Sequence, residues 1–139
     1  EAECADAEEA KLAGSGEKEN GYLESCYDID IEAANTERTG RADNITRYQR
    51  TEIIKAFCET ISAGGSKPML YTGMSYYKTM MNYKELRKYP LWIAYYPEVE
   101  KKTAKPTVSG YSIWQYSDKG KVPGIKGKVD MNSMIKRNW

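Results

Sequence analysis

The chain has 139 residues, the length of one ordinary domain, and its 21 Lys and Arg residues nearly balance its 20 Asp and Glu residues. It contains no His, which excludes Ser–His and Cys–His triads, a His general base and the HExxH zinc motif. There is no apolar run of about 18 residues, so we expect no membrane span. The Lys and Arg residues form no stripe with interleaved aromatics, so we also expect no nucleic-acid surface.

The first half of the chain predicts a helix, a strand and a second helix. Good helix formers fill residues 3–13, and a Gly-Ser-Gly turn ends them. Strict alternation of apolar and acidic residues predicts a strand near 25–32. Apolar residues on one helical face predict a helix over 46–63, which Gly64 and Gly65 would end.

The second half predicts shorter elements and more strands. Residues 67–72 form a short apolar strand, and residues 74–88 have helical spacing, with Met and Leu as core contacts. Further strands are expected near 91–95, 111–116 and 128–132.

Strands that alternate with helices indicate an α/β fold with a mainly parallel sheet, here of about five strands and two to three helices. A complete (β/α)₈ barrel needs about 250 residues, so this chain is expected to be a single incomplete domain over 1–139, corresponding to the later part of such a barrel. The strand near 25–32 would then have an open edge, which invites pairing with a second chain.

Three carboxylates share one face of that strand: Asp28, Asp30 and Glu32. Alternate residues of a strand lie roughly 6.6 Å apart, so these groups repel one another and raise one another's proton affinity. A protonated acid beside an ionised carboxylate is what glycoside hydrolysis requires. The same pattern also fits a solvated acidic edge strand or a divalent-cation site.

A second feature is the aromatic stretch over 111–117, followed by a Gly-rich loop and the sequence Val129-Asp130-Met131-Asn132. Trp and Tyr rings stack on sugar faces, and Gln and Asp bind hydroxyl groups. The stretch is equally typical of a buried aromatic strand with a turn after it.

Four segments resemble family 25 of the glycoside hydrolases, the Chalaropsis-type lysozymes. They are WQYSDKGKVPGIKGKVDMN over 114–132, PLWIA over 90–94, the helix, AG turn and strand over 57–72, and the DxE element Asp30-Ile31-Glu32. The resemblance covers nearly all of the chain from about residue 3, and the segments have the family's order and spacing.

The resemblance implies a muramidase, which cleaves the β-1,4 bond between N-acetylmuramic acid and N-acetylglucosamine in peptidoglycan. It implies an irregular β/α barrel with the site at the carboxyl ends of the strands. It also implies an enzyme that needs no cofactor and no metal. Such a protein is secreted, wall-associated or phage-encoded, and its partner is the peptidoglycan glycan strand.

Carried over by motif, Glu32 is the general acid, Asp30 orients or stabilises the reacting sugar, and Asp130 lines the same site. A second register of the motif pairs Asp28 with Asp30 instead. The substrate-binding residues implied are Tyr71, Trp92, Tyr95, Trp114 and Gln115.

No segment matches the family's first three strands, the first of which bears another active-site Asp. We therefore expect this chain by itself to have little or no muramidase activity. The alternative function is a non-catalytic wall-binding or structural remnant of such a domain.

Overall fold

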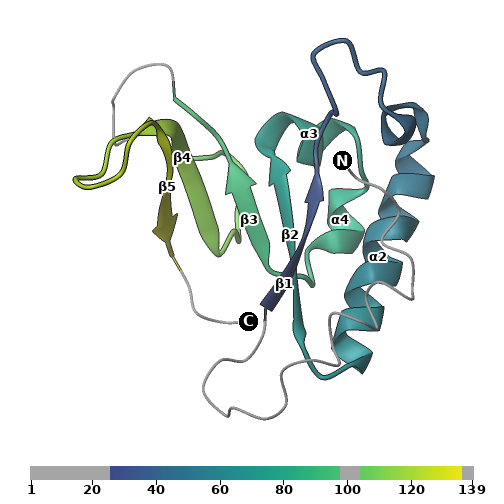
Figure 1. Cartoon of the computed structure of the whole chain (residues 1–139). Coiled ribbons are helices and arrows are strands. Elements are labelled where there is room, and N and C mark those ends of the chain that lie inside the picture. Colours follow the sequence, from purple (N-terminus) through teal and green to yellow (C-terminus); the bar gives the residue numbers. More distant parts are fainter. Residues whose placement is uncertain (1–25, 98–103, 136–139) are drawn as a thin grey trace.

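The computed structural model describes residues 26–97 and 104–135, which form a five-stranded sheet in the order β1-β2-β3-β4-β5 (Figure 1). The strands are β1 (Cys26–Ile31), β2 (Lys67–Gly73), β3 (Leu91–Ala94), β4 (Ile113–Gly120) and β5 (Val129–Met134). The first four strands pair in parallel, and β5 is antiparallel to β4. The expected mainly parallel α/β sheet is confirmed, and the helix expected over 3–13 lies outside the described residues.

The connection from β1 to β2 contains a short 3-10 helix, η1 (Arg41–Asn44), and the long helix α2 (Arg47–Ala63). Thr46 begins α2 with a reciprocal cap: its hydroxyl accepts the N–H of Gln49 at 3.1 Å, and the Gln49 side chain accepts the N–H of Thr46 at 2.9 Å. The N–H of Gly64 donates to the carbonyl of Thr60 at 3.1 Å where the helix ends. The helix predicted over 46–63 is therefore confirmed.

The single helix predicted over 74–88 is wrong, because the chain forms two short helices there, α3 (Met74–Thr79) and α4 (Tyr83–Leu86). Side chains of α2 take the backbone groups that would continue α3. Arg50 donates to the carbonyl of Met80 at 2.7 Å, and the Thr51 hydroxyl accepts the N–H of Asn82 at 2.9 Å. These contacts between elements override a helical spacing that is locally favourable.

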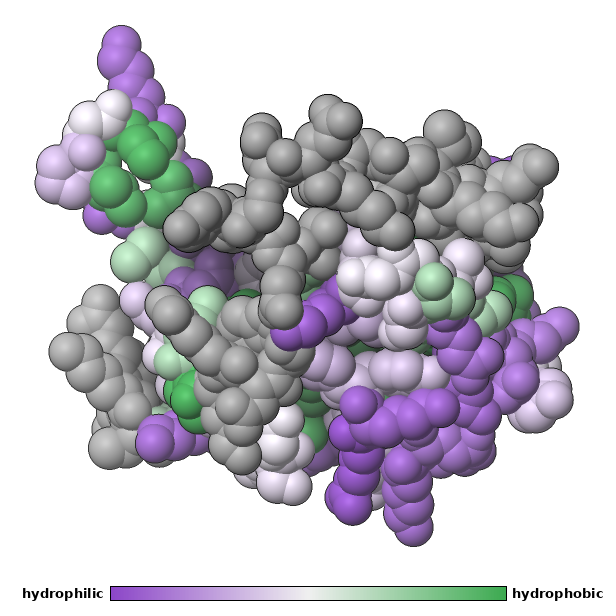
Figure 2. Space-filling view, turned by 90° about the horizontal axis from the view of Figure 1, so that it is seen from below, coloured by the Kyte–Doolittle hydropathy of each residue, from purple (hydrophilic) through white to green (hydrophobic). Residues whose placement is uncertain are grey.

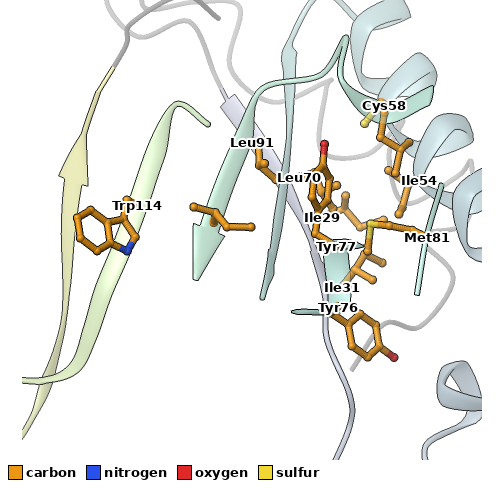
Figure 3. Packing of buried hydrophobic residues seen from close by; sticks show 12 residues of the cluster. Ile29, Ile31, Ile54, Cys58, Leu70, Tyr76, Tyr77, Met81, Leu91 and Trp114 are labelled. Atoms are coloured by element: carbon orange, nitrogen blue, oxygen red, sulfur yellow. The ribbon is translucent and has the colours of Figure 1, made fainter. Parts of the chain in front are cut away.

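The sheet has one apolar face, which packs against α2, α3 and α4. Figure 3 shows the buried cluster on this side, with Ile29 and Ile31 from β1, Leu70 from β2 and Ile54 from α2. Because side chains alternate along a strand, the residues between these point to the opposite face. That opposite face carries the polar and aromatic residues considered below.

The β4–β5 hairpin extends further than expected, since its strands cover 113–120 and 129–134 rather than 111–116 and 128–132. Its connection projects from the rest of the molecule at the left of Figure 2 and carries both apolar and hydrophilic residues. Val122 and Ile125 are exposed there, and Gly124 and Gly127 have positive φ angles of 89° and 101°. Only Gly adopts such angles without strain, which explains the Gly residues of this turn.

Within the described ranges, β1 pairs with β2 alone and is therefore an edge strand of the sheet. None of the helices in residues 26–97 and 104–135 is long and apolar enough to cross a membrane.

Candidate active site

Three carboxylates lie on the face of β1 that points away from the helices. Asp28 and Asp30 alternate with the buried Ile29 and Ile31, and Glu32 follows directly after the strand. All three carboxylate residues are exposed. Asp30 stands in register with Tyr71 of β2, while Asp28 stands one step lower beside Met69. The carboxylates thus form a line that leads to the carboxyl end of the sheet.

Asp30 has a perturbed proton affinity. Partial desolvation is the largest cause, followed by the negative charges of Glu32 and Asp28, and together they raise the pKa of Asp30 from 3.8 to about 6. Near neutral pH this group therefore exchanges its proton easily. The charge of Glu32 is the largest of the electrostatic contributions to this shift.

Two tyrosine hydroxyls converge on one buried amide beside these carboxylates. The hydroxyl of Tyr71 donates to Oε1 of Gln115 at 2.6 Å, and the hydroxyl of Tyr96 donates to the same oxygen at 2.8 Å. Gln115 is 3% exposed, so its side chain is fixed between β2 and the segment after β3. With both donors on Oε1, the amide orientation of Gln115 is defined.

Burial and nearby negative charges raise the pKa of both tyrosine hydroxyls. Burial is the main cause that raises the pKa of Tyr71, and Tyr96, Glu32 and Asp30 raise it further. Burial also raises the pKa of Tyr96, and the charges of Asp118, Asp130 and Glu32, in that order, raise it further. Asp130 comes from β5 and Glu32 from the residue after β1, which are the two edges of the described sheet.

Trp92 supplies the largest aromatic surface of the site. Its ring meets that of Tyr71 edge to face, with centroids 5.1 Å apart and planes at 76°. Its indole N–H donates to Oδ1 of Asn132 at 2.8 Å, which links β3 to β5 across β4. Asn132 is also in register with Gln115, so both amides lie on the face that carries the carboxylates.

Two of the aromatic residues implied as substrate-binding do not belong to this face. Trp114 is 8% exposed and lies in the buried cluster, in register with Ile93, and Figure 3 shows it on β4. Its indole N–H donates to the carbonyl of Tyr95 at 2.9 Å, and the Tyr95 side chain packs against the same cluster. The expectation for both residues is therefore corrected. Neighbours in a strand point to opposite faces, so Gln115 and Trp114 cannot both line the site.

Tyr96 and Asn132 were not predicted as site residues. The signal for Tyr96 is present in the sequence, because Trp92, Ala94 and Tyr96 follow one another at steps of two. Asn132 stands two residues after Asp130 and shares its face for the same reason. Alternation counted from Trp92 and Asp130 would have identified both.

No three Asp, Glu, Cys or His side chains in the described ranges lie close enough together to hold a metal ion. The face instead combines paired carboxylates, hydroxyl groups, amides and a partly exposed indole. Such a set can transfer a proton, stabilise a positive charge and hold a polar ring by stacking and hydrogen bonds.

Comparison with known proteins places most of this chain in a family. Residues 13–125 match the Glycosyl hydrolases family 25. The chain is 38% identical over 71 residues to the protein YegX of Escherichia coli O157:H7, and this match covers 49% of the chain and 24% of the relative. It is 32% identical over 85 residues to the autolytic lysozyme of Clostridium acetobutylicum, which covers 60% of the chain and 24% of that protein.

A solved structure agrees with these relatives. The bacterial lysozyme from Streptomyces coelicolor superposes with a TM-score of 0.60 at 26% identity, over 77% of this chain and 48% of that one. The chain spans about a quarter of the length of the curated relatives that it matches. The family match covers most of the chain, and its strands have the arrangement of part of an α/β barrel. This chain belongs to family 25 of the glycosyl hydrolases.

Proposed function

We propose that this protein acts on the bacterial cell wall as a peptidoglycan hydrolase, and that it cleaves the β-1,4 bond between N-acetylmuramic acid and N-acetylglucosamine. Family membership and a relative named as an autolytic lysozyme support the general activity. The observation that carries the proposal is the row of carboxylates Asp28, Asp30 and Glu32 on the polar face of the sheet, with Asp30 in register with Tyr71.

In the proposed mechanism Glu32 is the general acid, which protonates the glycosidic oxygen as the bond to the departing sugar breaks. Positive charge then develops on the ring carbon and its ring oxygen. Asp30, once ionised, stabilises this charge directly or through the 2-acetamido group of the sugar. Water finally attacks the ring carbon, and its proton returns to Glu32, which restores the starting state.

The choice of Asp30 and Glu32 over Asp28 and Asp30 rests on the neighbouring tyrosines. The charges of Glu32 and Asp30 both raise the pKa of Tyr71, and Glu32 also raises that of Tyr96. Asp28 stands one step further from the carboxyl end, beside Met69. In a β/α barrel the chemistry takes place at the carboxyl end, so the pair nearer to it is favoured.

The proposed sugar contacts come from the opposite side of the face. Trp92 offers a stacking surface, and Tyr71 offers a hydroxyl whose orientation the buried Gln115 side chain fixes. Asp130 lines the same face and adds a negative charge near Tyr96. Together these groups would hold the sugar ring between β2, β3 and β5.

The decisive experiment identifies which sugar carries the new reducing end. Purified peptidoglycan is incubated with the protein for many hours, and the products are reduced with borohydride and analysed by mass spectrometry. Reduced N-acetylmuramic acid is expected, and reduced N-acetylglucosamine as the new end would overturn the proposed bond. Glu32→Gln should abolish the release. The matched control is Glu59→Gln, which changes an exposed carboxylate on α2 and should leave the release unchanged.

A second candidate is a wall-binding module without turnover. It is favoured by the edge position of β1, which has no strand neighbour besides β2 in the described ranges. Sedimentation with insoluble peptidoglycan, with no new reducing ends above the level of the Glu32→Gln variant, would identify this function.

A further inference from the structure

The connection that follows Glu32 is closed on itself by one carboxylate. The side chain of Asp43, 8% exposed, accepts the N–H of Gly40 at 2.8 Å, and each of its oxygens lies 3.3 Å from the N–H of Ala34. The N–H of Asp43 in turn donates to the carbonyl of Gly40 at 3.0 Å. Asp43 thus holds both arms of the loop. One of the residues that it holds, Ala34, lies two residues after Glu32.

The two arms of this loop touch at Gly40. A Cβ atom added there would lie 2.4 Å from the Cβ of Ala34 and 2.8 Å from a carboxylate oxygen of Asp43. Such distances are far below ordinary contact, so the close approach requires Gly at this position. The segment after Glu32 is therefore packed tightly as well as hydrogen-bonded.

A buried cation attaches the loop to the helical layer. Arg50 of α2 is 2% exposed and donates to the carbonyls of Ala42 at 3.0 Å and Met80 at 2.7 Å. Its guanidinium carbon also lies 5.3 Å from the centre of the Tyr76 ring. Because Ala42 directly precedes Asp43, this hydrogen bond also fixes the backbone that carries the Asp43 carboxylate.

Glu32 lies between two such attachments. On one side the Thr72 hydroxyl donates to the carbonyl of Ile31 at 2.6 Å, where β1 ends. On the other side Asp43 holds Ala34. Glu32 itself is beyond the last paired residue of β1, so the sheet alone does not fix its backbone. We propose that Asp43 is a positioning residue, which sets the orientation of Glu32 at the active site through Ala34 and Gly40.

This inference rests on the proposed function only in so far as Glu32 is the general acid. A displacement of about 1 Å at a catalytic group can lower the rate of reaction about 100-fold. Loss of the Asp43 carboxylate should therefore act on turnover more than on binding. It should also alter the titration of Asp30, because the charge of Glu32 contributes to the pKa of that residue.

The test compares three variants with the wild-type protein. Asp43→Asn keeps the size of the side chain but replaces one acceptor with a donor. Gly40→Ala introduces the clash with Ala34 and leaves the carboxylate present, and Ala34→Gly combined with Gly40→Ala removes part of that clash. The matched control is Asn35→Ala, which removes hydrogen bonds to Thr39 at the exposed end of the same loop.

The readouts are thermal unfolding, carbon NMR titrations of the Glu32 and Asp30 carboxyl groups, and the rate of wall cleavage. Asp43→Asn and Gly40→Ala should shift both titrations and lower kcat at least about 10-fold with KM within about 2-fold. The double variant should recover part of the loss, and Asn35→Ala should match the wild-type protein. A folded Asp43→Asn or Gly40→Ala variant with unchanged titrations and kcat overturns the proposal.

One measurement needs no variant. The amide of Ala34 should exchange with deuterium slowly in the wild-type protein if the Asp43 bond holds it, and exchange at the unprotected rate overturns the proposal. Failure of the proposed function is distinguishable, since it appears as cleavage that survives Glu32→Gln or as no cleavage by the wild-type protein. The titrations and the exchange of Ala34 still decide the role of Asp43 in that case.

Discussion

Replacing Asp30 with Asn should make the protein more stable at neutral pH, although the residue belongs to the candidate site. Desolvation and the charges of Glu32 and Asp28 raise the pKa of Asp30 from 3.8 to about 6. Between these two values the folded protein binds more protons than the unfolded chain, so stability decreases as the pH rises through this window. An uncharged Asn side chain removes that unfavourable contribution.

The size of the gain follows from the shift and from exposure. One pKa unit corresponds to about 1.4 kcal/mol, so the full shift sets a ceiling of about 3 kcal/mol. Asp30 is exposed, however, and solvent screening reduces such contributions to about 1 kcal/mol or less. We therefore expect the free energy of unfolding to rise by about 1 kcal/mol at pH 7.5. At pH 3 no gain is expected, because Asp30 is then mostly protonated in both states.

Urea unfolding followed by Trp fluorescence measures this difference at both pH values. Glu59→Gln on α2 serves as the control, because it removes an exposed carboxylate and should change stability by less than about 0.5 kcal/mol. An equal gain at pH 7.5 and pH 3, or a loss at pH 7.5, would refute the reasoning. In the first case the effect would come from packing, and in the second from a lost favourable contact.

Three further outcomes are expected. Gln115→Leu should lower the free energy of unfolding by about 1–2 kcal/mol in urea denaturation, because the half-buried Tyr71 hydroxyl loses the amide oxygen that accepts its hydrogen bond, whereas the exposed Tyr96 hydroxyl can bond to water. A loss below about 0.5 kcal/mol would contradict this. Thr51→Val should lower the free energy of unfolding by about 1–3 kcal/mol in the same assay, since the N–H of Asn82 loses its acceptor. An unchanged urea midpoint would show that this hydrogen bond does not stabilise the chain between α3 and α4. The 139-residue chain should release reducing ends at least about 100-fold more slowly than the Streptomyces coelicolor lysozyme. Catalytic groups act as a unit, and no segment of this chain matches the family strand that bears a further active-site Asp. Equal specific activities of the two proteins would disprove this prediction.

Elements defined by their own residues could be predicted from the sequence. The alternation around Asp28 and Asp30 gave the correct strand and the correct face, since a half-buried strand must alternate. The helix α2 was predicted because its apolar face and its Gly64 stop agree, whereas its cap at Thr46 is known only from the structure. In each case local preference and tertiary packing favour the same structure.

The remaining differences come from contacts between distant residues. The break between α3 and α4 depends on Arg50 and Thr51, which lie about thirty positions earlier in the chain. The shared acceptor Gln115 joins Tyr71 and Tyr96, and no spacing rule relates these three residues. The resemblance to a family suggested which segments form the site but did not assign each side chain to a face.

The antiparallel direction of β5 has a consequence for how this fold can vary. In β1, β2 and β3 the residues at the site end of the sheet come at or after the carboxyl end of the strand, whereas in β5 they come near its beginning. Gln115 and Asn132 are therefore brought side by side on one face of the sheet by the connection between β4 and β5. A change in the length of that turn that slipped the register by one residue would rotate Asn132 and Asp130 away from the site together. The two strands of the hairpin therefore place these side chains as one unit, and a sequence change at its tip leaves the site intact only if the strand pairing is kept.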